Sequence, residues 1–140
     1  MCCFRAKYVL KSALALAFGA GIYILMNRDI IAFSGNVSFD FMPDFSFLAD
    51  TFPGKLAVCW GADLLWAMAL TYCVQAVMNF GRSECRYLLL CILPGVLFEI
   101  LQLTGFAAGT ADFADIAAYS AGTLLAIRDI SGGITNEENK

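Results

Sequence analysis

The sequence predicts an all-α membrane protein, a four-transmembrane-helix bundle with both termini on the cytoplasmic side. Three observations lead to this prediction. Hydrophobic residues make up 60% of the 140-residue chain and charged residues only 15%, whereas soluble domains average about 45–50% and about 25%. Four apolar runs approach the ~20 residues that a helix needs to cross a bilayer. Basic residues are divided unequally between the segments that join these runs, which sets the orientation.

The expected spans cover residues 9–26, 56–78, 87–104 and 111–127. Basic residues precede the first span, but no small-residue cleavage site follows it, so we interpret it as a retained helix rather than a signal peptide. Residues 1–130 are expected to form one transmembrane domain. Residues 131–140 are polar and are expected to form a frayed cytoplasmic tail.

The orientation follows from Lys and Arg, which are enriched in cytoplasmic segments. With four spans, one side collects seven basic residues and the other side two. The seven are Arg5, Lys7, Lys11, Arg82, Arg86, Arg128 and Lys140, and the two are Arg28 and Lys55. The segments 27–55 and 105–110 should therefore face outward. The longer segment alternates phenylalanine with aspartate, which suits the membrane interface. It would form either a covering loop or a lid over a site.

Carboxylates from three of the expected spans converge near the outer side. Asp63 should lie about 10 Å deep and Glu99 about 8 Å deep, at the helical rise of 1.5 Å per residue. Asp112 and Asp115 open the last span. Charged side chains at such depth are costly, and they usually face the protein interior or water and mark function. We therefore predict an acidic pocket formed by Asp63, Glu99, Gln102, Asp112, Asp115 and Tyr119.

Helical spacing predicts how these residues come together. Glu99 and Asp115 stand at similar distances from the turn 105–110, so they should share one depth and approach each other. Gly122 belongs to a row of small residues spaced by four, which allows close helix packing in lipid. We place Leu88 on the surface. The alternative for Asp112 and Asp115 is structural, since acids stabilise a helix N-terminus, with Thr110 as the N-cap.

The chemistry of such a pocket requires a counter-charge. Several carboxylates in a low-dielectric site cannot all stay ionised unless a proton or a cation is held among them. The six cysteines form no CxxC pair and the chain has no histidine, which argues against a zinc site. No nucleophile stands beside a base, so only acid–base chemistry on a lipid headgroup is left open for an enzyme. The net charge of −3 excludes a broad nucleic-acid surface.

The pattern Glu99-x-x-Gln102, followed by Asp112-x-x-Asp115 and Gly122, resembles the VanZ-like integral membrane proteins. The stretch "GTADFADIAAYSAG" is similar to the "GTFDxxDLxAYxxG" form of short members, and the resemblance covers roughly residues 56–126. It implies a multi-pass protein of the bacterial cytoplasmic (inner) membrane. It also implies a link to glycopeptide resistance, because the founding member is associated with low-level resistance to teicoplanin.

Two positions depart from that family pattern. Gly109 stands where many members carry arginine, and Tyr119 stands where many carry asparagine. Without the arginine, the acids lose their natural counter-ion. The sequence leaves three functions open. The pocket could bind a cation or the polar headgroup of an envelope lipid or cell-wall precursor. It could catalyse acid–base chemistry on such a headgroup. The acids could instead only orient helices in a small subunit of a membrane complex or oligomer. No cofactor is indicated.

Overall fold

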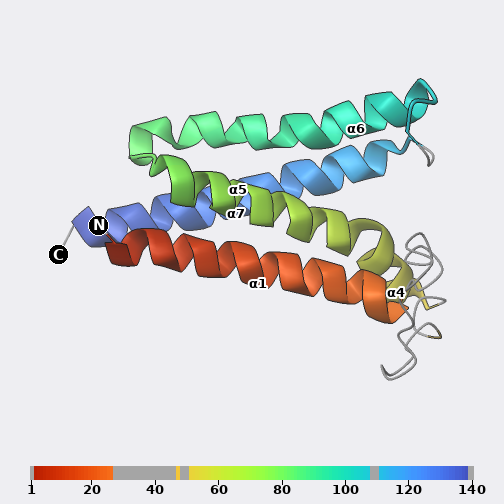
Figure 1. The fold of residues 1–140 in the computed structure, drawn as a ribbon, viewed down its shortest axis with the longest axis horizontal. Coiled ribbons are helices and arrows are strands. Elements are labelled where there is room, and N and C mark those ends of the chain that lie inside the picture. Colours follow the sequence, from red (N-terminus) through yellow and green to blue (C-terminus); the bar gives the residue numbers. More distant parts are fainter. Residues whose placement is uncertain (1, 27–46, 48–50, 108–110, 139–140) are drawn as a thin grey trace.

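All regular elements in the described part of the chain are helical. The computed structural model describes residues 2–26, 47, 51–107 and 111–138. Four long helical segments run back and forth alongside one another, and both chain ends lie at the same end of the bundle (Figure 1). The prediction of an all-α fold is confirmed. The outward loop expected between the first two helices falls largely on residues 27–46 and 48–50, outside the described residues.

Each expected span coincides with one helical segment, although the bounds differ. The first segment is α1 (Cys2–Met26). The second joins α4 (Phe52–Leu56), the π-helical η2 (Ala57–Gly61) and α5 (Ala62–Met78). The third joins η3 (Arg82–Ile92), a 3₁₀-helix, to α6 (Leu93–Leu103), and the fourth is α7 (Phe113–Glu138).

Two of these segments are long and apolar enough to cross a membrane. The segment from Phe52 to Met78 has 27 residues, and the segment from Arg82 to Leu103 has 22. Both exceed the ~20 residues that match the thickness of the hydrocarbon core. By length and composition, the described part of the chain therefore contains two candidate membrane-spanning segments.

Local signals explain why the second and third segments begin and end where they do. The Thr51 hydroxyl accepts a hydrogen bond from the backbone N–H of Gly54 at 3.2 Å, and Pro53 suits the first turn, so the helix begins earlier than residue 56. Asn79, with φ of 54°, ends α5 in the left-handed conformation. Gly105, with φ of 77°, lets the N–H of Phe106 bond to the carbonyl of Leu101, which closes α6 in a Schellman motif.

The helix α7 continues well past the predicted end of the fourth span. We expected a frayed tail after residue 130, but the helix extends to Glu138. Ile130 and Ile134 explain the difference, since both are buried in the core and hold this part of the helix against its neighbours. The apolar face of the helix therefore extends beyond the hydrophobic run that marked it in the sequence. The cytoplasmic location of this end is still a prediction.

The core lies where α1, α5, η3 and α7 meet. Its buried members are Tyr8, Tyr72, Ala76, Cys85, Leu88, Ala126, Ile130 and Ile134. Leu88 is fully buried there, so its predicted surface position is wrong. Close approach of α7 to α5 occurs at Gly122, where an added Cβ would lie 2.2 Å from the carbonyl oxygen of Leu64. Ala118 and Ala126 on the same row are also buried, as the spacing of small residues predicted.

At the end that carries the chain termini, a partly exposed polar cluster connects three helices. Lys11 of α1 forms an ion pair with Asp129 of α7. The Tyr72 hydroxyl of α5 donates a hydrogen bond to the same carboxylate at 3.1 Å. The Lys11 ammonium also lies 5.5 Å from the centre of the Tyr72 ring, within the range of a cation–π contact. This carboxylate is therefore neutralised within the protein.

Candidate functional site

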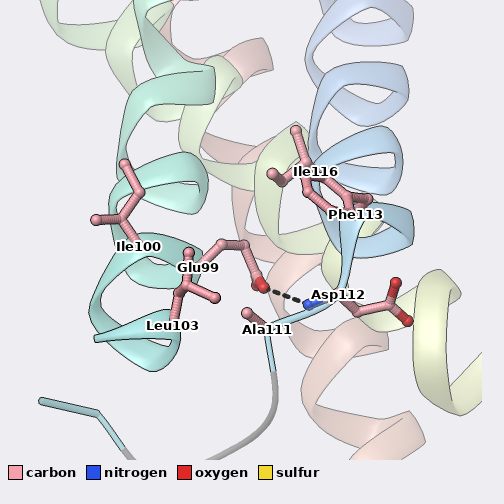
Figure 2. Close-up of a pocket in the computed structure, with 7 residues that line it drawn as sticks. All are labelled: Glu99, Ile100, Leu103, Ala111, Asp112, Phe113 and Ile116. Carbon is pink, nitrogen blue, oxygen red and sulfur yellow. Dashed lines mark hydrogen bonds between the residues drawn. The ribbon is translucent and has the colours of Figure 1, made fainter. Parts of the chain in front are cut away.

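Glu99 joins the end of α6 to the beginning of α7. Its side chain is only 5% exposed. Its Oε2 accepts a hydrogen bond from the backbone N–H of Asp112 at 2.8 Å (Figure 2). This N–H lies at the N-terminus of α7, where the helix dipole stabilises negative charge. The buried carboxylate is thus satisfied by a neutral donor and a dipole, which fixes the two helices across the turn that separates them.

Asp112 has a capping role. Its Oδ1 accepts a hydrogen bond from the backbone N–H of Ala114 at 2.9 Å, which makes Asp112 the N-cap of α7. Figure 2 shows its carboxylate pointing away from Glu99. Asp112 thus has a structural role at the N-terminus of α7, as the cap itself. The expected cap, Thr110, lies outside the described residues.

Tyr119 connects α7 to both α5 and α6. Its hydroxyl donates a hydrogen bond to Oδ1 of Asp63 at 3.3 Å. Its ring lies against Gly95 so closely that a Cβ there would be 2.4 Å from the ring. Any larger residue at position 95 would displace the ring or α6. The glycine is thus what lets Tyr119 reach Asp63 from the adjacent helix.

Asp115 completes the group of acids. It is half-buried on α7, one turn before Tyr119. Its carboxylate interacts electrostatically with Glu99 and with Asp63. Glu99 also interacts with Asp63, so three carboxylates, one each from α5, α6 and α7, lie within range of electrostatic interaction. Glu99 and Asp115 therefore lie within range of electrostatic interaction, while the acidic pocket that we predicted around them stays a prediction.

Gln102 is half-buried on α6 and lines neither of the two cavities near these acids. The smaller cavity, of about 120 Å³, lies between α6 and α7 beside Glu99 and Asp112 (Figure 2). The larger, of about 540 Å³, is a groove between α5 and the third helical segment. The lining residues of this groove are Asp63, Trp66, Ala67, Leu70, Cys91, Pro94, Gly95, Phe98 and Tyr119.

The groove exists because α6 diverges from α5. Figure 1 shows the two helices separating towards the end that carries α4, while α6 contacts α7. Tyr119 of α7 lies between them and, with Asp63, supplies the polar part of the lining. The helix type changes from 3₁₀ to α at Leu93, beside Pro94 of the groove wall.

Sequence reasoning missed the aromatic wall of the groove. Trp66 and Phe98 line it together with Tyr119. Trp66 follows Asp63 by three residues, which puts both on one side of α5, and this spacing could have indicated its place. Phe98 offered no comparable signal, because the sequence does not show how α6 is rotated against α5.

The acids are not arranged as a metal site. In the described ranges, no three Asp, Glu or Cys side chains come together as ligands for one ion. Within the described ranges, the one ion pair joins Lys11 to Asp129, far from these acids. The arrangement thus offers separated negative charges next to an apolar groove.

The fold and the site together define a class, an all-helical protein with two candidate spans and a largely apolar groove that the Asp63 carboxylate lines. Comparison with models of protein families, with curated proteins and with solved structures gives no match. The resemblance to VanZ-like proteins therefore rests on the sequence pattern alone.

Proposed function

We propose that this chain is a VanZ-like, four-span protein of the bacterial cytoplasmic membrane that binds a cation or the polar headgroup of an envelope lipid or cell-wall precursor. One observation carries the proposal. The Asp63 carboxylate, which accepts a hydrogen bond from the Tyr119 hydroxyl, lines a groove of about 540 Å³, and Glu99 and Asp115 lie on the adjoining helices α6 and α7. Small-molecule sites have volumes of about 300–1,000 Å³ and apolar walls with a few polar groups.

The distribution of basic residues supports the proposed topology. Lys11 lies at the end of the bundle with the chain termini, and η3, with Arg82 and Arg86, begins at that same end (Figure 1). Cytoplasmic ends of spans are enriched in such residues. The acids lie toward the opposite end, so the groove would be reached from the outer leaflet. Four spans would then consist of α1, the two candidate segments and α7.

Native mass spectrometry of the protein, purified in a mild non-ionic detergent, tests directly whether a ligand is bound. The parent protein is expected to retain one lipid or cell-wall precursor per chain. Neutralising two carboxylates in Asp63→Asn/Asp115→Asn should reduce that occupancy at least fivefold. The exposed pair Arg82→Gln/Glu84→Gln is the matched control and should retain it. A parent protein that carries no adduct under conditions where it stays folded would contradict the proposal.

A second candidate function is structural, and the bond between Glu99 and the Asp112 backbone favours it. In this hypothesis the acids only fix the helices of a small subunit of a larger membrane complex. Glu99→Gln distinguishes the two, because the amide oxygen can still accept the same hydrogen bond while the charge is lost. A structural role predicts unchanged ligand occupancy in that variant. A binding role predicts reduced occupancy at unchanged stability, and turnover of a labelled lipid would add an enzymatic activity.

A further inference from the structure

The charge of the groove limits what can occupy it. Asp63 lines the groove directly, and the carboxylates of Glu99 and Asp115 stand on the adjoining helices α6 and α7. No Lys or Arg of the described residues is paired with any of these three. Repulsion between like charges is strong where the dielectric constant is low. An anionic headgroup is therefore disfavoured, and charge complementarity selects a cationic group.

The walls of the groove limit the occupant further. Apart from Asp63 and the Tyr119 hydroxyl, the lining consists of apolar or aromatic side chains and one cysteine. Leu70 and Trp66 on one wall and Phe98 on the other are exposed to the surroundings of the bundle, so the groove opens sideways between α5 and α6. In a membrane-embedded bundle, such an opening faces the acyl chains. A membrane lipid can enter it laterally.

The form of the cationic group follows from the aromatic residues. Trp66, Phe98 and Tyr119 line the groove together with one carboxylate. Aromatic faces attract organic ammonium groups, and a carboxylate adds a direct charge contact. A metal ion would instead need several ligands at one point, and the described residues provide no such group.

We infer that the groove binds a membrane lipid whose headgroup ends in an ammonium group, with the ammonium at Asp63 and an acyl chain along Leu70. This inference rests on the proposed function and deepens it, since it names the class of headgroup. Its orientation follows from the lining, because Asp63 and Leu70 are seven residues apart on α5. At 1.5 Å per residue the two lie about 10 Å from each other along the helix.

The test uses tryptophan quenching in non-ionic detergent micelles. The chain has two tryptophans, and Trp60→Phe leaves Trp66 in the groove as the only reporter. The probes carry identical dibrominated acyl chains, and bromine quenches tryptophan at contact. Their headgroups are phosphoethanolamine, phosphoglycerol and glucose. Only the phosphoethanolamine lipid should quench Trp66 saturably, whereas the other two should quench weakly and in proportion to their concentration.

Two pairs of variants locate the binding. Asp63→Asn should weaken the apparent Kd of the phosphoethanolamine lipid at least tenfold. Asp112→Asn removes the same charge outside the groove and keeps the helix cap, so it should change the Kd less than twofold. Leu70→Phe should weaken binding severalfold by obstructing the chain. Val77→Phe, on an exposed face of the same helix, should not. If Asp63→Asn fails to fold, the comparison of Leu70→Phe with Val77→Phe still tests whether the lipid binds in the groove.

The outcomes separate this inference from the proposed function. Saturable binding of the glucosyl lipid without binding of the phosphoethanolamine lipid would overturn the inference and leave a polar-headgroup protein. Equal saturable binding of the phosphoglycerol lipid, or an unchanged Kd in Asp63→Asn, would also overturn it. If no probe binds saturably to the folded protein, both the inference and the binding function are wrong.

Discussion

The two ends of the bundle hold their carboxylates in different ways. At the end with the chain termini, the Asp129 carboxylate forms an ion pair with Lys11 and accepts a hydrogen bond from the Tyr72 hydroxyl. At the other end, Glu99 accepts a hydrogen bond from a backbone N–H, and Asp63 accepts one from the Tyr119 hydroxyl. Among the described residues, no ammonium or guanidinium pairs with either of these two carboxylates.

This difference distinguishes a carboxylate that is neutralised within the fold from carboxylates that have no ion-pair partner among the described residues. The ion pair with Lys11 neutralises the Asp129 carboxylate within the fold, although both side chains are partly exposed. Hydrogen bonds from neutral donors satisfy the oxygen lone pairs but leave the negative charge in place. The negative charge of Asp63 and Glu99 is therefore not neutralised by an ion pair with any described side chain. The same residue type thus has a different role at each end.

Thiol labelling in intact cells gives the largest expected contrast between the ends, because accessibility is all or none. In a cysteine-free background, Ser46→Cys lies in the segment predicted to face outward and Ser131→Cys lies near the end of α7. A membrane-impermeant maleimide should label Ser46→Cys and spare Ser131→Cys, as the seven-to-two division of basic residues requires. After the cells are permeabilised, both variants should react. Labelling in the reverse pattern would invert the assignment of the ends.

The largest stability effect is expected between the two ends, at Gly122. A leucine side chain there cannot fit, since even a Cβ would lie 2.2 Å from the carbonyl oxygen of Leu64. Gly122→Leu should reduce the free energy of unfolding by about 1–3 kcal/mol, which is typical of overpacking. Denaturation in mixed micelles measures this change. Leu124→Ile, on the exposed face of α7, is the control. Equal stability of Gly122→Leu and the parent would disprove the close contact of α7 with α5.

A smaller loss is expected when the ion pair is broken. Asp129→Asn removes the charge contact with Lys11 and weakens the bond from Tyr72, and these half-exposed contacts are together worth about 1 kcal/mol. The neighbouring exposed substitution Arg128→Gln should have little effect. A double-mutant cycle of Asp129→Asn with Lys11→Met measures the coupling between the two charges. Strict additivity of the two losses would show that the pair contributes nothing.

The smallest effect, with the opposite sign, is expected at Asp63. Asp63→Asn keeps an acceptor for the Tyr119 hydroxyl and removes the repulsion from Asp115 and Glu99. In lipid-free protein, the substitution should therefore leave the free energy of unfolding unchanged or raise it by up to about 0.5 kcal/mol. The same denaturation experiment measures this change, with Asp129→Asn as the variant for comparison. If Asp63→Asn lost as much free energy of unfolding as Asp129→Asn, the unpaired carboxylate would stabilise the fold as much as the ion-paired one, which would contradict the difference between the two ends.

The sequence by itself determined the helices and their approximate places. Long apolar runs and small residues spaced by four are local properties, so they predicted four helical segments and the buried row around Gly122. The sequence also identified the helices that carry the acids. It underestimated α7, because Ile130 and Ile134 are embedded in polar surroundings along the chain and gain their packing only from distant residues.

Only the tertiary structure decided which atoms meet. Periodicity fixes which residues share a face of one helix, but it does not fix how neighbouring helices are rotated and tilted. Glu99 therefore binds the backbone of Asp112 while the Asp112 carboxylate caps its own helix. Tyr119 reaches Asp63 because Gly95, on another helix, leaves room for the ring. The divergence of α6 from α5, which opens the groove, depends on packing between segments that the linear pattern does not contain.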